Sequence, residues 1–260
     1  HGRRVYAHVP HAMTLEDVLA LRVDSIEHLE GFARALGGQG WGQAAWASAD
    51  PARMAALARR VADSGVWSAP TLVVMLAPER AFADLAAAEA APPMRYANAA
   101  LLGFWRSAAA RAPVGTDFAA GYALARRGHA HRVRMLSALR EAGAPVLIGT
   151  DSPNPYLVYG FSLHEELAHF REAGYSNREI LRIATLDAAR FLNAEDRFGA
   201  LEPGMRADLV MLDGDPERDL AALRAPAGVM AAGRWHDARA LAAQLDEVAA
   251  IAAATRPAVR

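Results

Sequence analysis

The sequence predicts an α/β fold in which short strands and helices alternate around a parallel sheet. Strand-like apolar runs and segments of helical periodicity follow one another at the spacing of βα units. Residues 146–148 form a short run rich in β-branched side chains, which is typical of strands covered on both faces. With 260 residues, of which 53% are hydrophobic, the chain can bury a substantial core. It can therefore form one large domain, or a large domain and a small one.

Strand and helix signals can be placed along the chain in order. The expected strands cover residues 4–9, 25–29, 66–75 and 145–151. The expected helices cover residues 14–23, 51–65, 122–142, 162–174 and 177–192. Three of these helices have N-cap signals, which are Thr14 with Asp17, Asp50 with Pro51, and Ser176 with Glu179. The alternation indicates a parallel sheet of βα units.

Two further segments depart from this pattern. Residues 78–130 form a long Ala-rich stretch, broken by Pro92 and Pro93, that we interpret as a helical insertion. Residues 196–240 contain short strand-like runs separated by Pro-Gly and similar turns, which indicates a small β unit. The Ala-rich residues 241–260 are expected to form a helical tail.

Composition limits the function classes. The formal net charge is −1, so no basic excess indicates a nucleic-acid partner. No apolar run approaches the roughly 20 residues that span a bilayer. The chain has no cysteine, so a metal site would have to use His, Asp or Glu. A chain without cysteine suits the cytoplasm and the exterior equally, and the compartment stays open.

Metal-ligating residue types stand where three of the expected strands end. His8, His28 and Asp151 occupy these positions. In barrels and other parallel sheets, the carboxyl ends of the strands share one edge, where loops gather and ligands bind. Taken alone, Asp151 fits a helix N-cap or a turn equally well. Together with two imidazoles, however, it forms a set typical of a borderline divalent metal, so the sequence predicts a metal site here.

Several motifs resemble those of the amidohydrolase superfamily, near its imidazolonepropionase-like and dipeptidase-like branch. They are YAHV, DSIEHL, APTLVV, LIGTDSPNP, GFSLHEEL, ATLDAARFL and LEPGMRADLVMLDGDP. GTD before a helix and EPG-x-x-ADLV are specific in combination and weak separately. The resemblance covers nearly the whole chain and is weakest across residues 78–128.

The resemblance implies a partial (β/α)8 TIM-like barrel. Strands 5 to 8 and their helices would occupy residues 1–195, followed by a small β domain portion at 196–240 and the helical tail at 241–260. The family's first strand carries a His-x-His pair, and its fourth strand often carries a metal-bridging Lys or Glu. Both would precede His1, so we expect this chain to hold the carboxyl-terminal half of such a barrel.

The resemblance also implies roles for individual residues. His8 and His28 match the metal ligands at the tips of the fifth and sixth strands, and Asp151 matches the aspartate that ends the eighth. The implied reaction is hydrolysis of a C–N bond in a small amide, cyclic amide or dipeptide-like substrate, assisted by one or two divalent ions, with zinc expected. Asp151 would act as general base and return the proton to the leaving amine. His28 would bind the second metal or hydrogen-bond the substrate carbonyl, and His164 and His11 are candidates for substrate binding.

The remaining titratable residues are expected to have ordinary roles. His129 and His131 lie two apart on a helix, so they point about 200° apart, cannot chelate one ion, and are expected at the surface. Glu165 and Glu166 are expected only to complement the dipole of their helix. Two other histidines, His169 and His236, and the second GTD sequence that ends at Asp117 are expected to have no functional role.

One alternative to a hydrolase remains open, and a second is disfavoured. The chain could be a non-catalytic fragment or degenerate half-barrel that serves as a binding or assembly module, and its open barrel edge could promote self-association. A doubly wound binding protein without metal is disfavoured, because no Gly-rich phosphate loop follows a strand.

Overall fold

A parallel sheet organises the amino-terminal part of the chain. The computed structural model describes residues 3–256, and its first sheet consists of β1 (Tyr6–Ala7), β2 (Ser25–Glu27) and β3 (Trp67–Ala69), in the order β1-β2-β3. Both pairings are parallel, and Ile26 lies opposite Ala7 on one side and Ser68 on the other. Ser68 forms a further parallel bridge to Val146. The predicted α/β class with parallel pairing is confirmed.

Among residues 3–256, β1 pairs with β2 and with no other strand. Val5 and Tyr6 lie at this edge, and both are exposed. Apolar side chains on an unpaired strand edge are a known route to association between chains. Self-association of this protein through the edge stays a prediction.

All four expected strands are shorter in the structure. The strands expected over residues 4–9 and 25–29 are reduced to Tyr6–Ala7 and Ser25–Glu27. The strand expected over residues 66–75 ends at Ala69, and residues from Leu72 onward form helix α5, so the second half of that prediction is wrong. A continuous apolar run does not distinguish a buried strand from a buried helix. This run contains the start of a helix. The strand expected over residues 145–151 is reduced to the single bridge at Val146.

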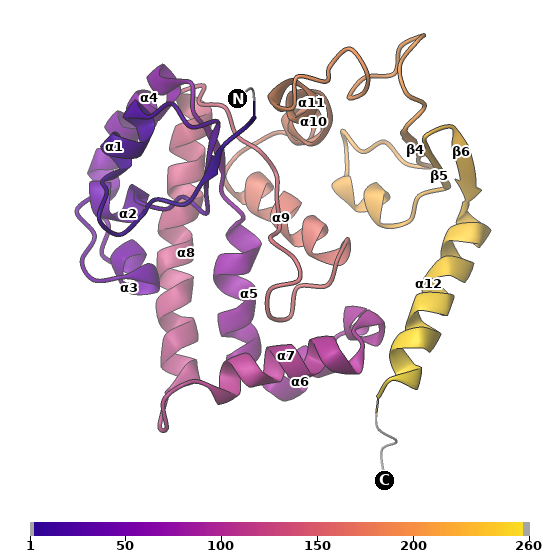
Figure 1. Ribbon diagram of the computed structural model, residues 1–260, viewed down its shortest axis with the longest axis horizontal. Helices are drawn as coiled ribbons and strands as arrows, with labels where there is room; N and C mark the ends of the chain where they lie inside the picture. The colour runs from indigo at the N-terminus through magenta and orange to yellow at the C-terminus, as the bar shows by residue number, and fades with distance from the viewer. Residues whose placement is uncertain (1–2, 257–260) are drawn as a thin grey trace. The chain divides into compact units, whose positions relative to one another are not determined.

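Helices surround this sheet in the first of two compact units, which comprises the described residues up to Ala88 together with Pro113–Tyr175. The helices are α1 (Leu15–Ala20), α2 (Phe32–Ala35), α3 (Gly42–Ala47), η1 (Pro51–Arg53), α4 (Met54–Ser64), α5 (Leu72–Ala83), α8 (Phe118–Glu141) and α9 (Phe161–Glu172), while α6 (Leu85–Ala90) leads out of the unit. The long helix α8 runs alongside α5 and also packs against α3 and α4 (Figure 1). Fully buried side chains such as Phe32, Leu57 and Leu136 form the core.

The three predicted N-caps are confirmed, whereas the helix expected from residue 122 begins earlier, at Phe118. The Thr14 side chain accepts a hydrogen bond from the Asp17 N–H while Asp17 bonds back to the Thr14 backbone, which completes the capping box of α1. Ser176 and Glu179 form the same reciprocal arrangement at α10 (Asn177–Arg182). Asp50 accepts from the Ala52 N–H at the start of η1. Each cap satisfies backbone donors that a helix start leaves without partners.

The second unit comprises Glu89–Ala112 and the described residues from Ser176 onward. Its helices are η2 (Pro92–Tyr96), α7 (Ala99–Ala110), α10 (Asn177–Arg182), the π-helical turn η3 (Ile183–Asp187), α11 (Ala188–Phe191), η4 (Leu220–Arg224) and α12 (Ala238–Ala254). Three antiparallel strands, β4 (Leu209–Met211), β5 (Gly228–Ala231) and β6 (Arg234–Asp237), lie within the segment expected to be a small β unit.

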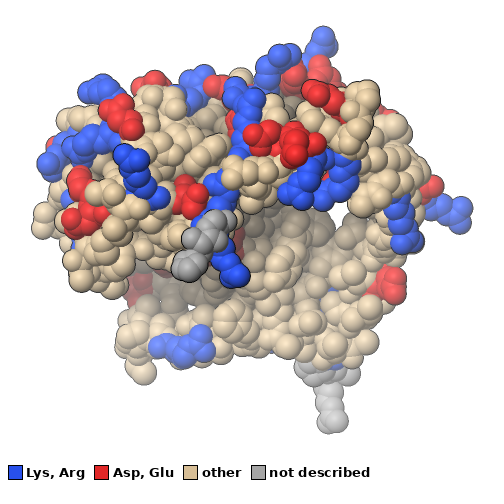
Figure 2. Space-filling view, turned by 45° about the horizontal axis from the view of Figure 1, so that its top comes forward, with Lys and Arg blue, Asp and Glu red and all other residues tan. Residues whose placement is uncertain are grey.

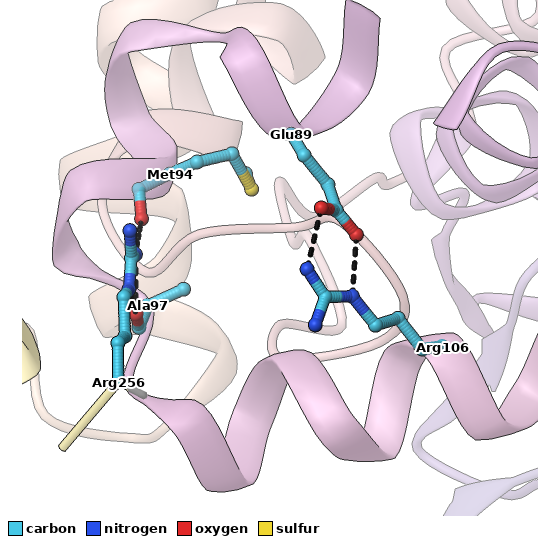
Figure 3. A network of polar contacts seen from close by, with 5 residues as sticks. All are labelled: Glu89, Met94, Ala97, Arg106 and Arg256. Carbon is cyan, nitrogen blue, oxygen red and sulfur yellow. Dashed lines mark hydrogen bonds and ion pairs between the residues drawn. The ribbon is translucent and has the colours of Figure 1, made fainter. Parts of the chain in front are cut away.

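Arginine side chains hold the irregular parts of the second unit together (Figure 3). The Arg256 guanidinium, just beyond α12, donates to the backbone carbonyls of Met94 and Ala97 at η2. Arg106 on α7 forms a bidentate pair with Glu89, with N···O distances of 2.7 and 2.6 Å. Planar two-point contacts of this kind fix orientation as well as distance.

The two units divide the chain at Ser176, whereas the predicted boundary lies at residue 196. The functional division at 195 and 240, with an insertion at 78–130, stays a prediction. The first two residues of the predicted barrel portion and the last four of the predicted tail lie outside the described range.

On the face shown in Figure 2, basic and acidic side chains are interspersed. A search of the described residues finds no helix long and apolar enough to cross a membrane.

Candidate active site

His28 and Asp151 lie against each other at the carboxyl edge of the parallel sheet. His28 follows directly after β2, and Asp151 ends the segment that begins with the bridged Val146. The Nε2 atom of His28 lies 3.6 Å from Oδ2 of Asp151. The side chain of His28 is 12% exposed and that of Asp151 is 44% exposed, so the pair faces solvent from the carboxylate side. Two of the three predicted metal ligands are therefore brought together.

Thr71, at the tip of the neighbouring strand β3, orients the His28 ring. Its hydroxyl shares a 2.6 Å hydrogen bond with Nδ1 of His28, which leaves Nε2 free on the side of Asp151. Burial lowers the pKa of the His28 imidazole, an effect that the Asp151 carboxylate opposes and the neighbouring His8 ring reinforces. Burial thus favours the neutral ring, which is the form that binds metals.

His8 lies next to His28, with ring centroids 5.0 Å apart. Its Nδ1 atom is 3.1 Å from Oε2 of Glu30, and the same Glu30 oxygen accepts from the Val9 N–H at 3.0 Å. Each of the two histidines therefore contacts a polar neighbour through Nδ1 and leaves Nε2 for other contacts. With 64% of its side chain exposed, His8 is the least constrained member of the predicted set.

The backbone at these strand tips adopts a left-handed conformation. The φ angles are +59° at His28, +44° at Thr71 and +53° at Asp151. Such values are uncommon for residues other than glycine, and for a β-branched residue such as Thr71 they are outliers. Each costs about 1–2 kcal/mol, and such residues cluster at functional sites. Three such residues lie on adjacent strand tips, which supports a functional role for this edge of the sheet.

The loop that carries Asp151 is fixed to α9. The Asp151 carbonyl accepts hydrogen bonds from the backbone N–H of Asn154 at 3.2 Å and from its side-chain amide at 2.9 Å. One residue further along, Ser152 shares a 2.7 Å hydrogen bond with Ser162 in the first turn of α9. The turn geometry therefore holds the Asp151 backbone in place while its carboxylate faces His28.

Glu166 connects α9 to the tip of β3. Its two carboxylate oxygens accept from the backbone N–H groups of Leu72 at 3.0 Å and Val73 at 2.8 Å, at the start of α5. All three residues are fully buried. Burial raises the pKa of Glu166 to about 8, against the lowering effect of the two backbone donors. The expectation that Glu166 serves only its own helix dipole is wrong, because it caps another helix, 94 residues away in sequence.

A cavity of about 610 Å³ opens beside the two histidines. His8, His11 and His28 line it together with aromatic and charged side chains, among them Trp41, Trp46, Arg34 and Arg132. His11 packs edge-on against Trp41, with ring centroids 4.6 Å apart. The volume of this cavity lies within the range of about 300–1,000 Å³ that small-molecule sites occupy.

The two predicted substrate-binding histidines differ in their placement. His11 lies in the cavity wall. His164 lies half-buried on α9, and the described residues that line the cavity do not include it. Substrate roles for both histidines stay predictions.

Three histidines expected to lie at the surface or to have no functional role make defined contacts in the structure. His129 is buried, with 7% of its surface exposed, so its expected surface location is wrong. It lies beside His169, and both lie near Glu172. His131 points elsewhere and shares a 2.6 Å hydrogen bond through Nδ1 with the Trp46 carbonyl. The geometric argument that His129 and His131 cannot share one ion agrees with these directions, but the sequence spacing gave no sign of the partner histidine on α9.

The search of the described residues for side chains that could share a metal ion gives one group, formed by His129, His169 and Glu172. The ligand atoms of these three residues all lie within 4.8 Å of one another. His8, with its contact to Glu30, does not complete such a group with His28 and Asp151. Rotation of the exposed His8 ring would be needed to bring its Nε2 atom closer.

Two known proteins match parts of the chain in sequence. The chain is 43% identical over 84 residues to an imidazolonepropionase of Deinococcus deserti, a match that covers 32% of this chain and 21% of that protein. It is 33% identical over 98 residues to a 5-methylthioadenosine/S-adenosylhomocysteine deaminase of Symbiobacterium thermophilum, covering 33% of this chain and 22% of that protein.

Solved structures match over most of the chain. The bottromycin amidohydrolase superposes with a TM-score of 0.64 and 28% identity, covering 96% of this chain and 54% of that one. A Xaa-Pro dipeptidase with bound methionine shares the fold, with a TM-score of 0.56 and 18% identity over 91% of this chain and 45% of its own. The chain thus spans about half the length of these structural relatives. A sequence model described as the amidohydrolase family matches residues 2–236, and the chain belongs to that family.

Proposed function

We propose that this chain forms part of a metal-dependent hydrolase that cleaves C–N bonds in small amide or peptide substrates. The observation that carries the proposal is the pairing of His28 with Asp151 at 3.6 Å, beside His8, on adjacent tips of one parallel sheet. Membership of the amidohydrolase family supports the reaction class.

The residues present suit a divalent metal. His8, His28 and Asp151 offer two imidazole nitrogens and a carboxylate, a donor set that fits zinc and other borderline ions. The contacts of Thr71 with His28 and of Glu30 with His8 are the kind of outer partners that orient metal-binding histidines. A metal held there would activate a water molecule and polarise the substrate carbonyl.

Asp151 is the candidate general base. Its carboxylate is the solvent-facing member of the pair, so it can take a proton from the attacking water and return it to the leaving amine. His28, held by Thr71, has two possible roles, which are to bind a metal or to hydrogen-bond the substrate carbonyl. The structural relatives are about twice as long as this chain, and we propose that the part of the fold not included here supplies the remaining ligands.

The lining of the cavity supports a substrate with a negatively charged group. Arg132 lies in the wall, stacks over Trp46 at 5.1 Å and donates to Gln43 at 2.7 Å. Arg132 is buried, with 2% of its surface exposed, so it would act on a substrate through its positive charge and not through a direct hydrogen bond. A dipeptide-like substrate carries a carboxylate that this charge would favour.

The assignment is tested in the full-length protein by comparing Asp151→Asn with Asp117→Asn. Both aspartates end a Gly-Thr-Asp sequence, but Asp117 only caps α8, where it accepts from the Ala120 N–H. Asp151→Asn is expected to lower amide hydrolysis by about 10²-fold or more while the protein stays folded, because an amide is a poor base and a weak ligand. Asp117→Asn is expected to keep near-normal turnover.

Metal dependence and substrate class need separate measurements. Chelation should abolish turnover, and added Zn²⁺ should restore it. Dipeptides with a free carboxylate should be cleaved better in kcat/KM than their carboxamides, by about 10-fold for a charge preference of about 1.4 kcal/mol. Near-normal turnover by Asp151→Asn would refute the assignment and favour a binding or assembly module instead.

A further inference from the structure

Three metal-ligating side chains meet between helices α8 and α9, in a group separate from the strand-tip residues. His129 lies on α8, and His169 and Glu172 lie on α9. Oε2 of Glu172 is 3.6 Å from Nε2 of His129 and 3.7 Å from Nδ1 of His169. The two imidazole rings are in edge-on contact, with centroids 4.4 Å apart.

His129 is buried without the hydrogen bonds that a buried imidazole needs. Its side chain is 9% exposed, and neither Nδ1 nor Nε2 has a hydrogen-bond partner. Leaving a buried polar group without a partner is costly and rare. A neutral imidazole carries one nitrogen lone pair that can bind a metal ion.

The separations are close to those of a coordination shell. Zinc binds imidazole nitrogen and carboxylate oxygen at about 2.0–2.2 Å, so two ligands of a tetrahedral ion lie about 3.4 Å apart. The measured 3.6 and 3.7 Å exceed this by a few tenths of an ångström, which small side-chain rotations can close. The third pair of ligand atoms, on the two histidines, lies within 4.8 Å.

The surroundings admit an ion and water. Glu172 is 56% exposed, which leaves an entry path and room for a water ligand. His169 and Glu172 stand three residues apart in the last turn of α9, where the helix dipole favours positive charge. Arg132 and Arg80 oppose positive charge at this group, whereas Glu165, which is paired with Arg80, and Glu172 favour it. His131, the other histidine of this α8 turn, is engaged with Trp46.

We propose that His129, His169 and Glu172 bind a divalent transition metal ion, with two imidazoles and a carboxylate as ligands and water completing the shell. Two nitrogen donors favour zinc and similar ions over Mg²⁺ and Ca²⁺. The ion would join α8 to α9. It would therefore stabilise the packing of the helix that carries Glu166.

The test uses full-length protein stripped of metal by a chelator and titrated with Zn²⁺. His169→Gln and Glu172→Gln remove ligands near the surface, where the fold tolerates substitution better than at the buried His129. His131→Gln is the matched control on the same helix. His28→Gln removes a ligand of the strand-tip group, so that the two groups are counted separately.

In calorimetry, His169→Gln and Glu172→Gln should each lose one bound Zn²⁺ per chain relative to the wild type, and His131→Gln should lose none. Zinc at about 100 times the Kd of the helix group should raise the melting temperature of His28→Gln by about 5–10 °C, and this rise should be absent in the double variant His28→Gln/His169→Gln. Cobalt substitution should give visible absorption bands that persist in His28→Gln and vanish in the same double variant.

The inference is overturned if His169→Gln and Glu172→Gln bind as many zinc ions as the wild type and show the same rise in melting temperature. It is also overturned if every zinc ion is lost in His28→Gln. Failure of the strand-tip assignment would appear differently, as turnover in Asp151→Asn with normal zinc uptake by the helix group.

Discussion

Replacing Glu166 with Gln tests how the strand tips are held in place. In the wild type, both carboxylate oxygens accept a backbone N–H from the start of α5, and all the groups involved are buried. A Gln side chain has the same shape but only one acceptor. Its NH₂ group would face either the Leu72 or the Val73 N–H, so two donors would oppose each other in a fully buried site.

The cost follows from the loss of one buried hydrogen bond and the burial of unpartnered donors. An unsatisfied buried group costs about 1–3 kcal/mol, so the free energy of unfolding should fall by about 2–4 kcal/mol. For a unit of this size, 1 kcal/mol shifts the melting temperature by about 2–4 °C, which gives a decrease of about 5–15 °C. Thermal melting followed by circular dichroism measures this shift.

Glu165→Gln is the matched control. Glu165 is the preceding residue on α9, but its side chain is exposed and pairs with Arg80 at 3.0 Å. Surface pairs of this kind contribute about 0–1 kcal/mol, so the control should melt within a few degrees of the wild type. Equal melting temperatures for the two variants would refute the assignment of Glu166 as the buried cap of α5.

The pH dependence supplies a second measurement. Because burial raises the pKa of Glu166 to about 8 from an ordinary value of 4.5, the folded chain retains a proton that the unfolded chain has released between these values. The contribution of this group to the free energy of unfolding is thus fully present below about pH 4.5 and is lost as the pH rises through about 8. Glu166→Gln lacks this dependence, so the difference in stability between wild type and variant should shrink from pH 5 to pH 8. Parallel pH curves for the two proteins would contradict the raised pKa.

Three further substitutions have definite expected outcomes. Thr71→Val removes the hydroxyl that orients His28 and should weaken metal binding at the strand tips by about 10- to 100-fold in equilibrium dialysis, and unchanged affinity would contradict the orienting role. Gly38→Ala would place a Cβ atom 2.2 Å from the Ala45 carbonyl oxygen and should cost about 1–3 kcal/mol or more in denaturant unfolding, whereas a neutral result would contradict this close approach. Ser176→Ala removes the capping-box hydroxyl of α10 and should cost about 1 kcal/mol by the same assay, with no loss expected if the cap were incidental.

Short-range signals in the sequence predicted the fold class and the starts of several helices. Capping boxes involve residues three apart, so Thr14 and Ser176 could be identified as helix starts without knowledge of their surroundings. The meeting of His28 and Asp151 was also predictable, because parallel βα units bring strand ends to one edge whatever lies between them.

Features that depend on contacts between distant segments could not be predicted. The run from Thr71 to Met75 is apolar enough for a strand, and a carboxylate 94 residues away supplies the cap for its helical start. Nothing near His129 in sequence shows that α9 will bury it beside His169. Burial of Glu166 could not be inferred either, because the adjacent Glu165 has the same chemistry and is exposed.

The left-handed backbone at His28, Thr71 and Asp151 lowers the stability of the fold at positions whose side chains form the site. Glycine at any of them would relieve about 1–2 kcal/mol of strain, partly offset by about 0.5–1 kcal/mol of added chain entropy in the unfolded state. Selection for stability alone would therefore favour glycine or asparagine where the side chains of the site now stand. A descendant that kept this fold but no longer needed its chemistry should drift at these three positions before its core changes.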